Sequence, residues 1–312
     1  MERLRGEDVL LVGRDAERLT ALGGESRVAG LDEPERLTEV LRGCAVVVNC
    51  VAPFGTWGER VVRAAIAAGV HYVDISGEQA YLMHVFEQYG RQARDAGVTV
   101  VPMVNDGGFL VDLLAGAMAS RLDRIEDVVV AHRFTGDVGL SRGSGRSALA
   151  NLRMFRDGGL VHTDGRFSDG PVKTSSITFP GDAEPSPVGK FALPEVATIP
   201  RHVHARRVEA VAEADLIALF DAVTADMVEA LPENPGRDGG FVLLAEMTGE
   251  RRLRGVVEGT DPYGTTAVVA AEAARRLAAG AVESGVLAPA QAFDPVDFLD
   301  SLAPHGVSWS IS

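Results

Sequence analysis

Apolar and polar positions in the first third of the chain alternate between short apolar runs, typical of strands, and longer amphipathic segments, typical of helices. The expected order is a strand over 8–12, a helix over 15–22, a strand over 27–29, a helix over 33–42, a strand over 45–51, a helix over 59–68, a strand over 71–75, a helix over 80–96, a strand over 98–104 and a helix over 110–122. Such alternation is typical of right-handed β-α-β units. The run 45–51 is almost entirely apolar, as in strands buried on both faces of a parallel sheet. The pattern therefore predicts an α/β fold.

The second part of the chain has a different sequence pattern, in which expected strands are separated by loops rich in Gly, Pro and Asp. Strands are expected over 127–134, 175–179, 203–211, 241–248 and 252–259. They predict a mixed, largely antiparallel sheet in a second α+β domain. We expect domains over 1–122 and 123–312, with the alanine-rich helix over 265–279 returning to the first domain. The proline-rich stretch 179–187 is expected to be the most flexible loop.

No glycine-rich loop precedes the first expected strand, which runs directly into Gly13, Arg14 and Asp15. In a Rossmann unit the first strand and its G-x-G-x-x-G turn hold the pyrophosphate, and the second strand ends at the adenine ribose. Five strand–helix repeats are present where six would complete the sheet. We therefore expect a partial Rossmann-like parallel sheet that keeps the ribose end and lacks its first β-α unit. Whether the chain is a shortened product or naturally lacks this unit stays open.

The composition excludes several classes of partner. A formal charge of −14 disfavours nucleic acid and anionic membranes, because both need a basic surface.

Cys44 and Cys50 share one expected strand, roughly 20 Å apart, which is too far for a disulfide, and we expect buried thiols of a reducing compartment. No stretch is typical of a signal peptide or of a membrane span, so a cytoplasmic protein is expected. No spacing of Cys, His and carboxylates predicts a metal site.

Specific motifs carry a family resemblance. They are VNCVAPFG at 48–55 followed by Gly58-Glu59, HYVDISGE at 71–78, GVTVVP at 97–102, GTDPYGTTA at 259–267 and LAPA at 287–290. Together they closely resemble the saccharopine dehydrogenase-like reductase family over nearly the whole chain. The resemblance implies a Rossmann domain that binds NADP(H) and an α+β domain that holds the substrate, in members that reduce imines, carbonyls or enoyl groups. The chain departs from the family in its missing glycine loop and in NDGGFL at 105–110, where relatives carry a Gly-Phe-Asp-Ser-like turn.

Candidate cofactor-binding residues lie where strands of the first domain end. Arg14 is placed where NADP enzymes carry a cation for the ribose 2′-phosphate, and its alternative is a surface pairing with Asp15 or Glu17. At the carboxyl edge of the sheet, where open α/β folds bind ligands, the candidates are Val51, Ala52, Pro53, Phe54 and Gly77. The alternative for the 51–55 segment is an ordinary tight turn.

Three residues are candidates for acid or base catalysis. Glu78 ends one strand at the same edge, where desolvation would raise the pKa of its carboxyl; the alternative is a carboxylate that stabilises the following helix. Asp106 is analogous one strand later, and the glycines beside it allow close approach of a ligand or only of the other domain. Tyr263 is the third candidate.

Substrate-binding candidates come from the second part of the chain. Ser144 lies in the segment 143–148, and Arg142 directly precedes it; this segment fits G-x-G-x-x-A but follows a loop rather than a strand. They would meet a substrate anion at a helix N-terminus, and the alternative is a Ser-capped helix with solvated arginines. His204 belongs to a basic cluster that would line a cleft or simply face solvent.

Three functions are consistent with the sequence. The first is an NADP(H)-dependent oxidoreductase that acts on a small metabolite at the interdomain cleft. The second is a cofactor-independent cyclase or isomerase on a degenerate reductase scaffold. The third is a non-catalytic partner whose open sheet is completed by another chain. As the chain stands, NADPH is expected to bind weakly or not at all, and an open sheet would favour a homo-oligomer.

Overall fold

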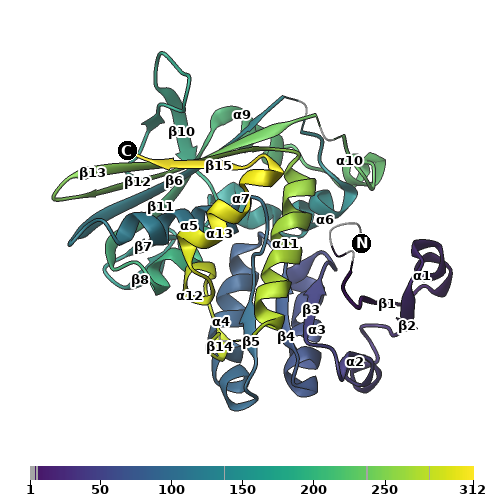
Figure 1. Ribbon diagram of the computed structural model, residues 1–312. Helices are drawn as coiled ribbons and strands as arrows, with labels where there is room; N and C mark the ends of the chain where they lie inside the picture. Colours follow the sequence, from purple (N-terminus) through teal and green to yellow (C-terminus); the bar gives the residue numbers. More distant parts are fainter. Residues whose placement is uncertain (1–3, 5, 137, 237, 281) are drawn as a thin grey trace.

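A computed structural model describes residue 4 and residues 6–136, 138–236, 238–280 and 282–312. The described strands form a two-stranded sheet, a four-stranded sheet and a nine-stranded sheet (Figure 1). The first two are parallel and carry helices between their strands, and the third is mixed. The predicted α/β fold with a partial parallel sheet and a second, mixed sheet is confirmed.

The two-stranded sheet lies to one side of the molecule together with α1 (Ala16–Leu22) and α2 (Pro34–Leu41) (Figure 1). It joins β1 (Leu10–Gly13) to β2 (Glu25–Val28), with Leu10 opposite Glu25. All four residues of β1 are only half-buried, although three of them are apolar. The main contact between this part and the rest of the molecule is the packing of α2 on α3.

The four-stranded sheet has the order β14-β5-β4-β3. Its elements are β3 (Val46–Asn49), α3 (Phe54–Ala68), β4 (His71–Asp74), α4 (Gln79–Asp95), β5 (Thr99–Val101) and β14 (Gly285–Val286). The strands expected between residues 8 and 104 form two parallel sheets rather than one, because among the described residues β1 pairs with β2 and no strand continues the hydrogen bonding between β1 and β3. On the opposite edge, β14 adds a strand that comes from near the C-terminus.

The nine-stranded sheet follows the order β15-β13-β12-β6-β11-β10-β9, with β7 paired to β11 and β8 paired to β7. Its strands are β6 (Ile125–Thr135), β7 (Val161–Thr163), β8 (Arg166–Ser168), β9 (Ser176–Ile177), β10 (Ser186–Lys190), β11 (Ala205–Glu213), β12 (Gly240–Gly249), β13 (Arg252–Thr260) and β15 (Ser308–Ile311). β6 and β11 run parallel, and β12 pairs antiparallel with both β6 and β13. The predicted mixed sheet is therefore present, with more edge strands than the sequence pattern indicated.

The helix α5 (Gly108–Ala119) forms the centre of the largest apolar core. It is apolar around nearly its whole circumference and contacts β12, β13, α12 (Pro289–Ala292) and α13 (Pro295–Ser301). Gly255 of β13 permits this packing, because a Cβ atom there would lie 2.5 Å from the Met118 sulfur. The helix α11 (Pro262–Ala278) contacts β3 and β4, which ties the end of the mixed sheet to the parallel one.

The remaining described helices are short. They are α6 (Arg142–Ala150), α7 (Leu152–Asp157), α8 (Glu195–Thr198), α9 (Ala214–Asp221) and α10 (Ala225–Ala230). Two sequence expectations need correction in the first third. Helix α3 begins at Phe54, five residues before its expected start at Glu59. Cys50 was expected to be a buried thiol but is exposed, because β3 ends at Asn49 and the residue lies beyond the strand.

Arg133 of β6 holds together the segment that was expected to be a flexible loop. Its guanidinium donates to both carboxylate oxygens of Asp182, at 2.9 and 2.8 Å, and to both of Glu213, at 2.7 and 2.6 Å. It also lies 4.0 Å from the centre of the Phe179 ring. Since such paired, partly buried guanidinium groups fix geometry bidentately, the 179–186 segment is tied to the sheet.

We expect the substitution Arg133→Met to lower the free energy of unfolding by about 1–3 kcal/mol, because it leaves two carboxylates without their shared cation. Urea denaturation measures this loss, and limited proteolysis should cut near Asp182 first. The matched control is Arg153→Met, since Arg153 is 96% exposed and lies 3.7 Å from Asp157. Equal stability of the two variants would contradict this role of Arg133.

Glu209 of β11 fixes a second loop in the same way. Burial raises the pKa of its carboxyl, but hydrogen bonds from the amides of Lys173 and Thr174 and from Arg207 outweigh burial and hold the pKa below its usual value. A carboxyl whose pKa is depressed by folding contributes stability that is present above its unfolded pKa and is lost as the pH falls through the folded pKa.

We therefore expect the stability of the wild-type chain to fall as the pH drops below about 4.5, the ordinary pKa range of a glutamate. Glu209→Gln should be less stable than wild type at pH 7 and should show a flatter dependence of unfolding free energy on pH between about 5 and 3. The exposed Glu35→Gln is the control and should retain the wild-type slope. A wild-type slope in Glu209→Gln would disprove the assignment.

Candidate functional site

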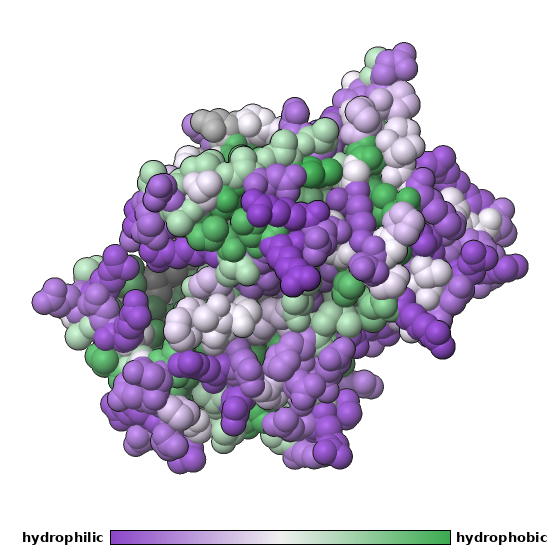
Figure 2. Space-filling view, turned by 180° about the vertical axis from the view of Figure 1, so that it is seen from behind, coloured by the Kyte–Doolittle hydropathy of each residue, from purple (hydrophilic) through white to green (hydrophobic). Residues whose placement is uncertain are grey.

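The carboxyl ends of β3, β4 and β5 lie at one edge of the four-stranded sheet, as parallel strands require. Figure 2, which views the molecule from behind, shows the surface hollowed between the part that carries β1 and β2 and the rest of the molecule. Val51 is 42% exposed and follows β3 at this edge. In open α/β sheets this is the edge at which ligands bind.

Glu78 joins three elements at this edge. Its carboxylate accepts hydrogen bonds from the backbone N–H groups of Phe54 and Gly55, each at 2.7 Å, and from the Asn151 side chain at 2.8 Å. Phe54 begins α3, so the carboxylate caps that helix, where the helix dipole favours a negative charge. The sequence had suggested that Glu78 stabilises the helix after it; the structure shows that it stabilises the helix before it. The predicted gathering of Phe54 and Glu78 is present.

The helices after β1 and β3 carry a carboxylate cap at their N-termini, whereas Glu33, which precedes α2, makes no side-chain hydrogen bond to that helix. Asp15 accepts from the Arg18 amide at 3.0 Å, Glu33 accepts from the Gly30 amide at 3.0 Å, and Glu78 caps α3. A helix N-terminus is a phosphate site when its N–H groups are available and no negative charge occupies it. The N-termini of α1 and α3 therefore do not fit the pyrophosphate of a dinucleotide.

Arg14 lies where the adenine ribose end of such a cofactor would bind. It follows β1 directly, its side chain is exposed, and within the described residues it has no ion pair. The alternative pairing with Asp15 is not formed, because Asp15 instead caps α1 and lies 3.9 Å from Arg18. An unpaired guanidinium at the end of this strand suits a ribose 2′-phosphate.

A buried carboxylate supports the edge from beneath. Asp74, at the end of β4, accepts hydrogen bonds from the hydroxyls of Tyr72 and Tyr81 and from the amides of Ser76 and Met103, at 2.8 to 3.0 Å. Burial raises the pKa of the Asp74 carboxyl. The hydrogen-bond donors act in the opposite direction, because they favour its ionised form. Because its carboxylate accepts these four hydrogen bonds, Asp74 fixes the turn that leads to Gly77 and Glu78.

Asp106 lies one strand further along and is held by α11. Its Oδ1 accepts from the Thr266 hydroxyl at 2.7 Å, and its amide donates to the same hydroxyl at 3.0 Å. Burial raises the pKa of its carboxyl, Asp261 raises it further, and His132 acts in the opposite direction. A carboxyl in such surroundings is a candidate acid or base.

Two residues that the sequence analysis did not single out lie beside Asp106. His132 of β6 pairs through Nε2 with Glu195 Oε1 of α8 at 2.5 Å, and both side chains are almost completely buried. A Cβ atom at Gly107 would lie 3.1 Å from His132 Cε1, so the ring packs directly on the turn after Asp106. The only available sequence signal was a histidine alone in the apolar run of β6.

The predicted substrate-binding residues of α6 come together with Tyr263. The Tyr263 hydroxyl accepts from the Ser141 amide at 2.8 Å and lies 3.2 Å from the Ser144 hydroxyl. Ser141 caps α6 by accepting from the Ser144 amide, as the alternative interpretation expected. Arg142 donates to the Leu231 carbonyl at 3.1 Å. Tyr263 thus anchors the start of α6 to the start of α11.

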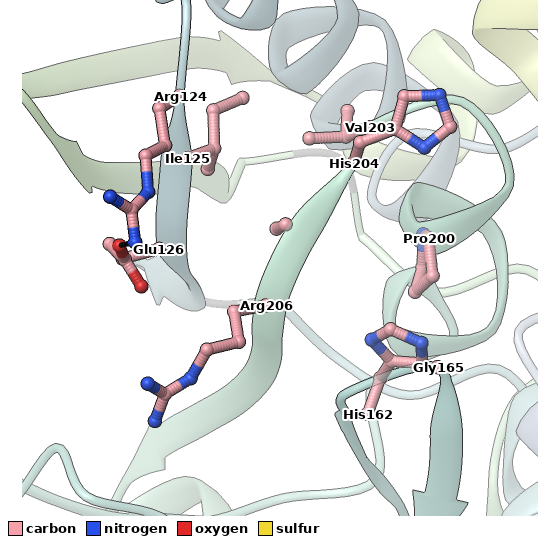
Figure 3. Close-up of a pocket in the computed structure, with 10 residues that line it drawn as sticks. Arg124, Ile125, Glu126, His162, Gly165, Pro200, Val203, His204 and Arg206 are labelled. Atoms are coloured by element: carbon pink, nitrogen blue, oxygen red, sulfur yellow. Dashed lines mark ion pairs between the residues drawn. The ribbon is translucent and has the colours of Figure 1, made fainter.

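His204 lies elsewhere. It lines an open surface pocket of about 500 Å³ between the beginnings of β6 and β11, shown in Figure 3 with Arg124, Glu126, His162 and Arg206. This pocket lies near the C-terminal end of α5, whereas Asp106 lies near its N-terminal end. His204 therefore does not share a site with the other candidates.

The described residues contain no cluster of His, Cys, Asp and Glu that could hold a metal ion. In the same part of the chain no helix is both long and apolar enough to cross a membrane.

Parts of the chain are similar to known proteins. Residues 5–101 match the family model described as the saccharopine dehydrogenase NADP binding domain. The human saccharopine dehydrogenase-like oxidoreductase is 28% identical over 140 residues, which are 42% of this chain and 33% of the human protein. These matches place residues 5–101 in the saccharopine dehydrogenase-like family. A lipid droplet localized protein of Caenorhabditis elegans is 42% identical over 74 residues, 24% of this chain and 17% of that protein.

The fold of this saccharopine dehydrogenase-like chain also matches solved structures. Apo saccharopine dehydrogenase (L-Glu forming) from Saccharomyces cerevisiae superimposes with a TM-score of 0.62 over 99% of this chain and 95% of the yeast chain, at 14% identity. At that identity the likeness establishes the fold alone. The chain spans a third or less of the lengths of the two relatives described above, so their activities are not carried over with the match.

We expect Glu78→Gln to lower the free energy of unfolding by about 1–3 kcal/mol, because an amide keeps one acceptor oxygen and sets its NH₂ group against donors. Thermal and urea unfolding measure the loss. Exchange of the Phe54 and Gly55 amides with solvent should also accelerate. The exposed Glu184→Gln is the control and should unfold like wild type. An unchanged exchange rate at Phe54 would show that the cap is dispensable.

Proposed function

We propose that this saccharopine dehydrogenase-like chain is an NADP(H)-dependent oxidoreductase that acts on a small metabolite between the carboxyl edge of its parallel sheet and the mixed sheet. The observation that carries the proposal is Arg14, an exposed guanidinium just after β1 that has no ion pair among the described residues and lies inside the segment that matches an NADP-binding domain. A cation at this position suits the 2′-phosphate of NADP rather than the bare ribose of NAD.

The remaining candidates would surround the reacting groups. Val51 to Phe54 and Gly77 end neighbouring strands at the edge where an open sheet holds its ligand. When bound, the cofactor supplies or accepts the hydride. The protein's part is to orient the substrate and to exclude water, and Asp106 is placed to hold a proton beside it.

Binding of the cofactor to the 312 residues alone should be weak. The N-termini of α1 and α3 are occupied by Asp15 and Glu78, so the pyrophosphate would gain no backbone donors from these two helices. Charge-assisted hydrogen bonds are worth about 1.5–3 kcal/mol each, so the absence of two weakens binding by about two to four powers of ten. Hydride transfer then depends on hydrogen-bond donors to the pyrophosphate that are supplied from outside the described residues.

A second function is supported by a separate observation. His132 pairs with Glu195 and packs on the turn after Asp106, and acid–base chemistry at this point needs no cofactor. A cyclase or isomerase on a reductase scaffold would use such groups.

Titration of the purified chain with NADPH by calorimetry tests the proposal. We expect a dissociation constant in the millimolar range, with 2′,5′-ADP binding about as tightly as NADPH, because the pyrophosphate and nicotinamide add little. Low-micromolar binding of NADPH would show that another element holds the pyrophosphate. Equal affinity for 2′,5′-ADP and 5′-AMP would remove the role of the 2′-phosphate.

Arg14→Ala separates the cation from the rest of the site. We expect it to weaken binding of 2′,5′-ADP by about three- to tenfold, the effect of one exposed charge-assisted contact of about 0.7–1.4 kcal/mol, and to leave 5′-AMP binding unchanged. The control is Arg36→Ala, an exposed arginine of α2 paired with Glu39. Nuclear magnetic resonance titration is suited to this affinity range.

A further inference from the structure

Strands β1 and β3 each have an edge without a neighbouring strand. Within the described residues β1 pairs only with β2, and β3 pairs only with β4. Every residue of β2 is exposed whereas those of β1 are half-buried, so β1 is the strand of the small sheet that faces the body of the molecule. Figure 1 shows β1 on the side toward β3, and Val12 of β1 and Val47 of β3 pack against the same apolar cluster. The free edges of β1 and β3 therefore border one gap between the two parallel sheets.

The backbone of β1 presents unpaired groups to this gap. The Gly13 carbonyl accepts a hydrogen bond from the Ala29 amide on the side of β2. Successive residues of a strand turn their N–H and C=O groups to opposite edges, so those of Leu10 and Val12 point away from β2. No described strand pairs with them on that side. Two residues of β1 are thus available to pair with a further strand.

The backbone of β3 presents the same pattern from the other side of the gap. The Ala45 carbonyl accepts from the His71 amide on the side of β4, so the N–H and C=O groups of Val46 and Val48 point away from β4. No described strand pairs with these groups either, although the Cys50 sulfur lies 4.0 Å from the Val48 carbonyl. A row of unpaired groups along a strand edge is a template for pairing with an added strand.

The side chains beside the gap are apolar on both faces of the sheet. Val46 and Val48 pack against the large core around α5, whereas Val47 and Val12 pack against the second core. All four are only half-buried, whereas Tyr72 of the neighbouring strand β4 is completely buried. A strand that filled the gap would have an apolar core on each face, as the central strands of parallel sheets do. The gap therefore fits a strand that is apolar at successive positions rather than at alternate ones.

A second copy of this chain is a poor source for such a strand. A strand inserted between β1 and β3 needs both of its own edges free for hydrogen bonding. Every described strand is already paired with at least one neighbour, so a second copy could supply one only by breaking its own sheet. The fitting occupant is a strand of a different polypeptide.

We propose that the gap is a docking site for an apolar β-strand of a partner polypeptide, aligned parallel to β1 and β3 and hydrogen-bonded to both. Since β2, α2 and β3 follow one another as a β-α-β unit, whose strands run parallel, one strand can pair with both edges in the same direction. The place corresponds to the first strand of a Rossmann sheet, which lies between the second strand and the fourth. A glycine-rich turn after the docked strand would give the pyrophosphate its backbone donors, and this last step alone rests on the proposed function.

Binding of a synthetic peptide to the full chain tests the docking site without any cofactor. The peptide has about five consecutive Val and Ile residues, a G-x-G-x-x-G turn and a helix-forming tail of Ala, Glu and Lys. We expect fluorescence anisotropy to show that it binds about tenfold or more tightly than a scrambled peptide of the same composition. In the complex the amides of Val12 and Val48 should exchange with solvent more slowly. Equal binding of the two peptides, or unchanged exchange at both amides, would overturn the proposal.

Two proline variants locate the edge that the peptide uses. Val12→Pro removes an N–H that points into the gap, and we expect it to weaken peptide binding about tenfold. The matched control is Ser26→Pro, because by the same alternation the Ser26 N–H points to the far, outer edge of β2. Proline is tolerated on a free strand edge, so both variants should fold, which circular dichroism checks. An equal loss of binding in both variants would contradict docking between β1 and β3.

A second measurement separates docking from the proposed function. With saturating peptide, the affinity for NADPH should rise about tenfold or more, and a peptide whose turn glycines are replaced by alanine should dock equally well without this gain. Docking without any gain in NADPH affinity would support the strand site and count against the oxidoreductase proposal. Failure of the peptide to dock would overturn the strand site and leave the comparison of 2′,5′-ADP with 5′-AMP as the independent test of Arg14.

Discussion

The arrangement at the edge of the parallel sheet depends on one carboxylate. Glu78 follows β4, caps α3 and accepts from Asn151 at the start of α7, so a single charge connects the parallel sheet, its first long helix and the helices that flank the mixed sheet. Next to it, Gln79 donates to the Leu193 carbonyl and accepts from the Leu160 amide. The first N–H groups of a helix need hydrogen-bond partners. Because Glu78 already accepts from those at the start of α3, they are not available to bind an anion.

Local sequence patterns predicted most of the elements because apolar periodicity is local information. The strands 45–51 and 241–248 and the helices 80–96 and 110–122 were each expected within a few residues of where they lie. The one-sheet arrangement was not correct, because strand pairing depends on what lies beside a strand and not on its own residues. Short edge strands such as β14 were missed, since two residues carry no periodicity.

The candidate site could be predicted only where its residues are adjacent in the chain to a strand end. Glu78 and Asp106 were found in this way, because both follow apolar runs. His132 and Glu195 were not, since 63 residues separate them and only the fold brings them to 2.5 Å. Arg133 and Asp182 are likewise distant in the chain and are brought together only by the fold. The loop that composition predicted to be flexible is therefore held by a cation from a distant strand.

The interruption between β1 and β3 has a thermodynamic consequence. The small sheet adds no backbone hydrogen bond to the larger one within the described residues and is supported chiefly by α2 packing on α3, so its opening free energy can be lower than that of the core around α5. Any group that bridges the two sheets stabilises the small one by its own binding free energy. The occupancy of this edge and the order of residues 10–41 are therefore linked, and each reports on the other.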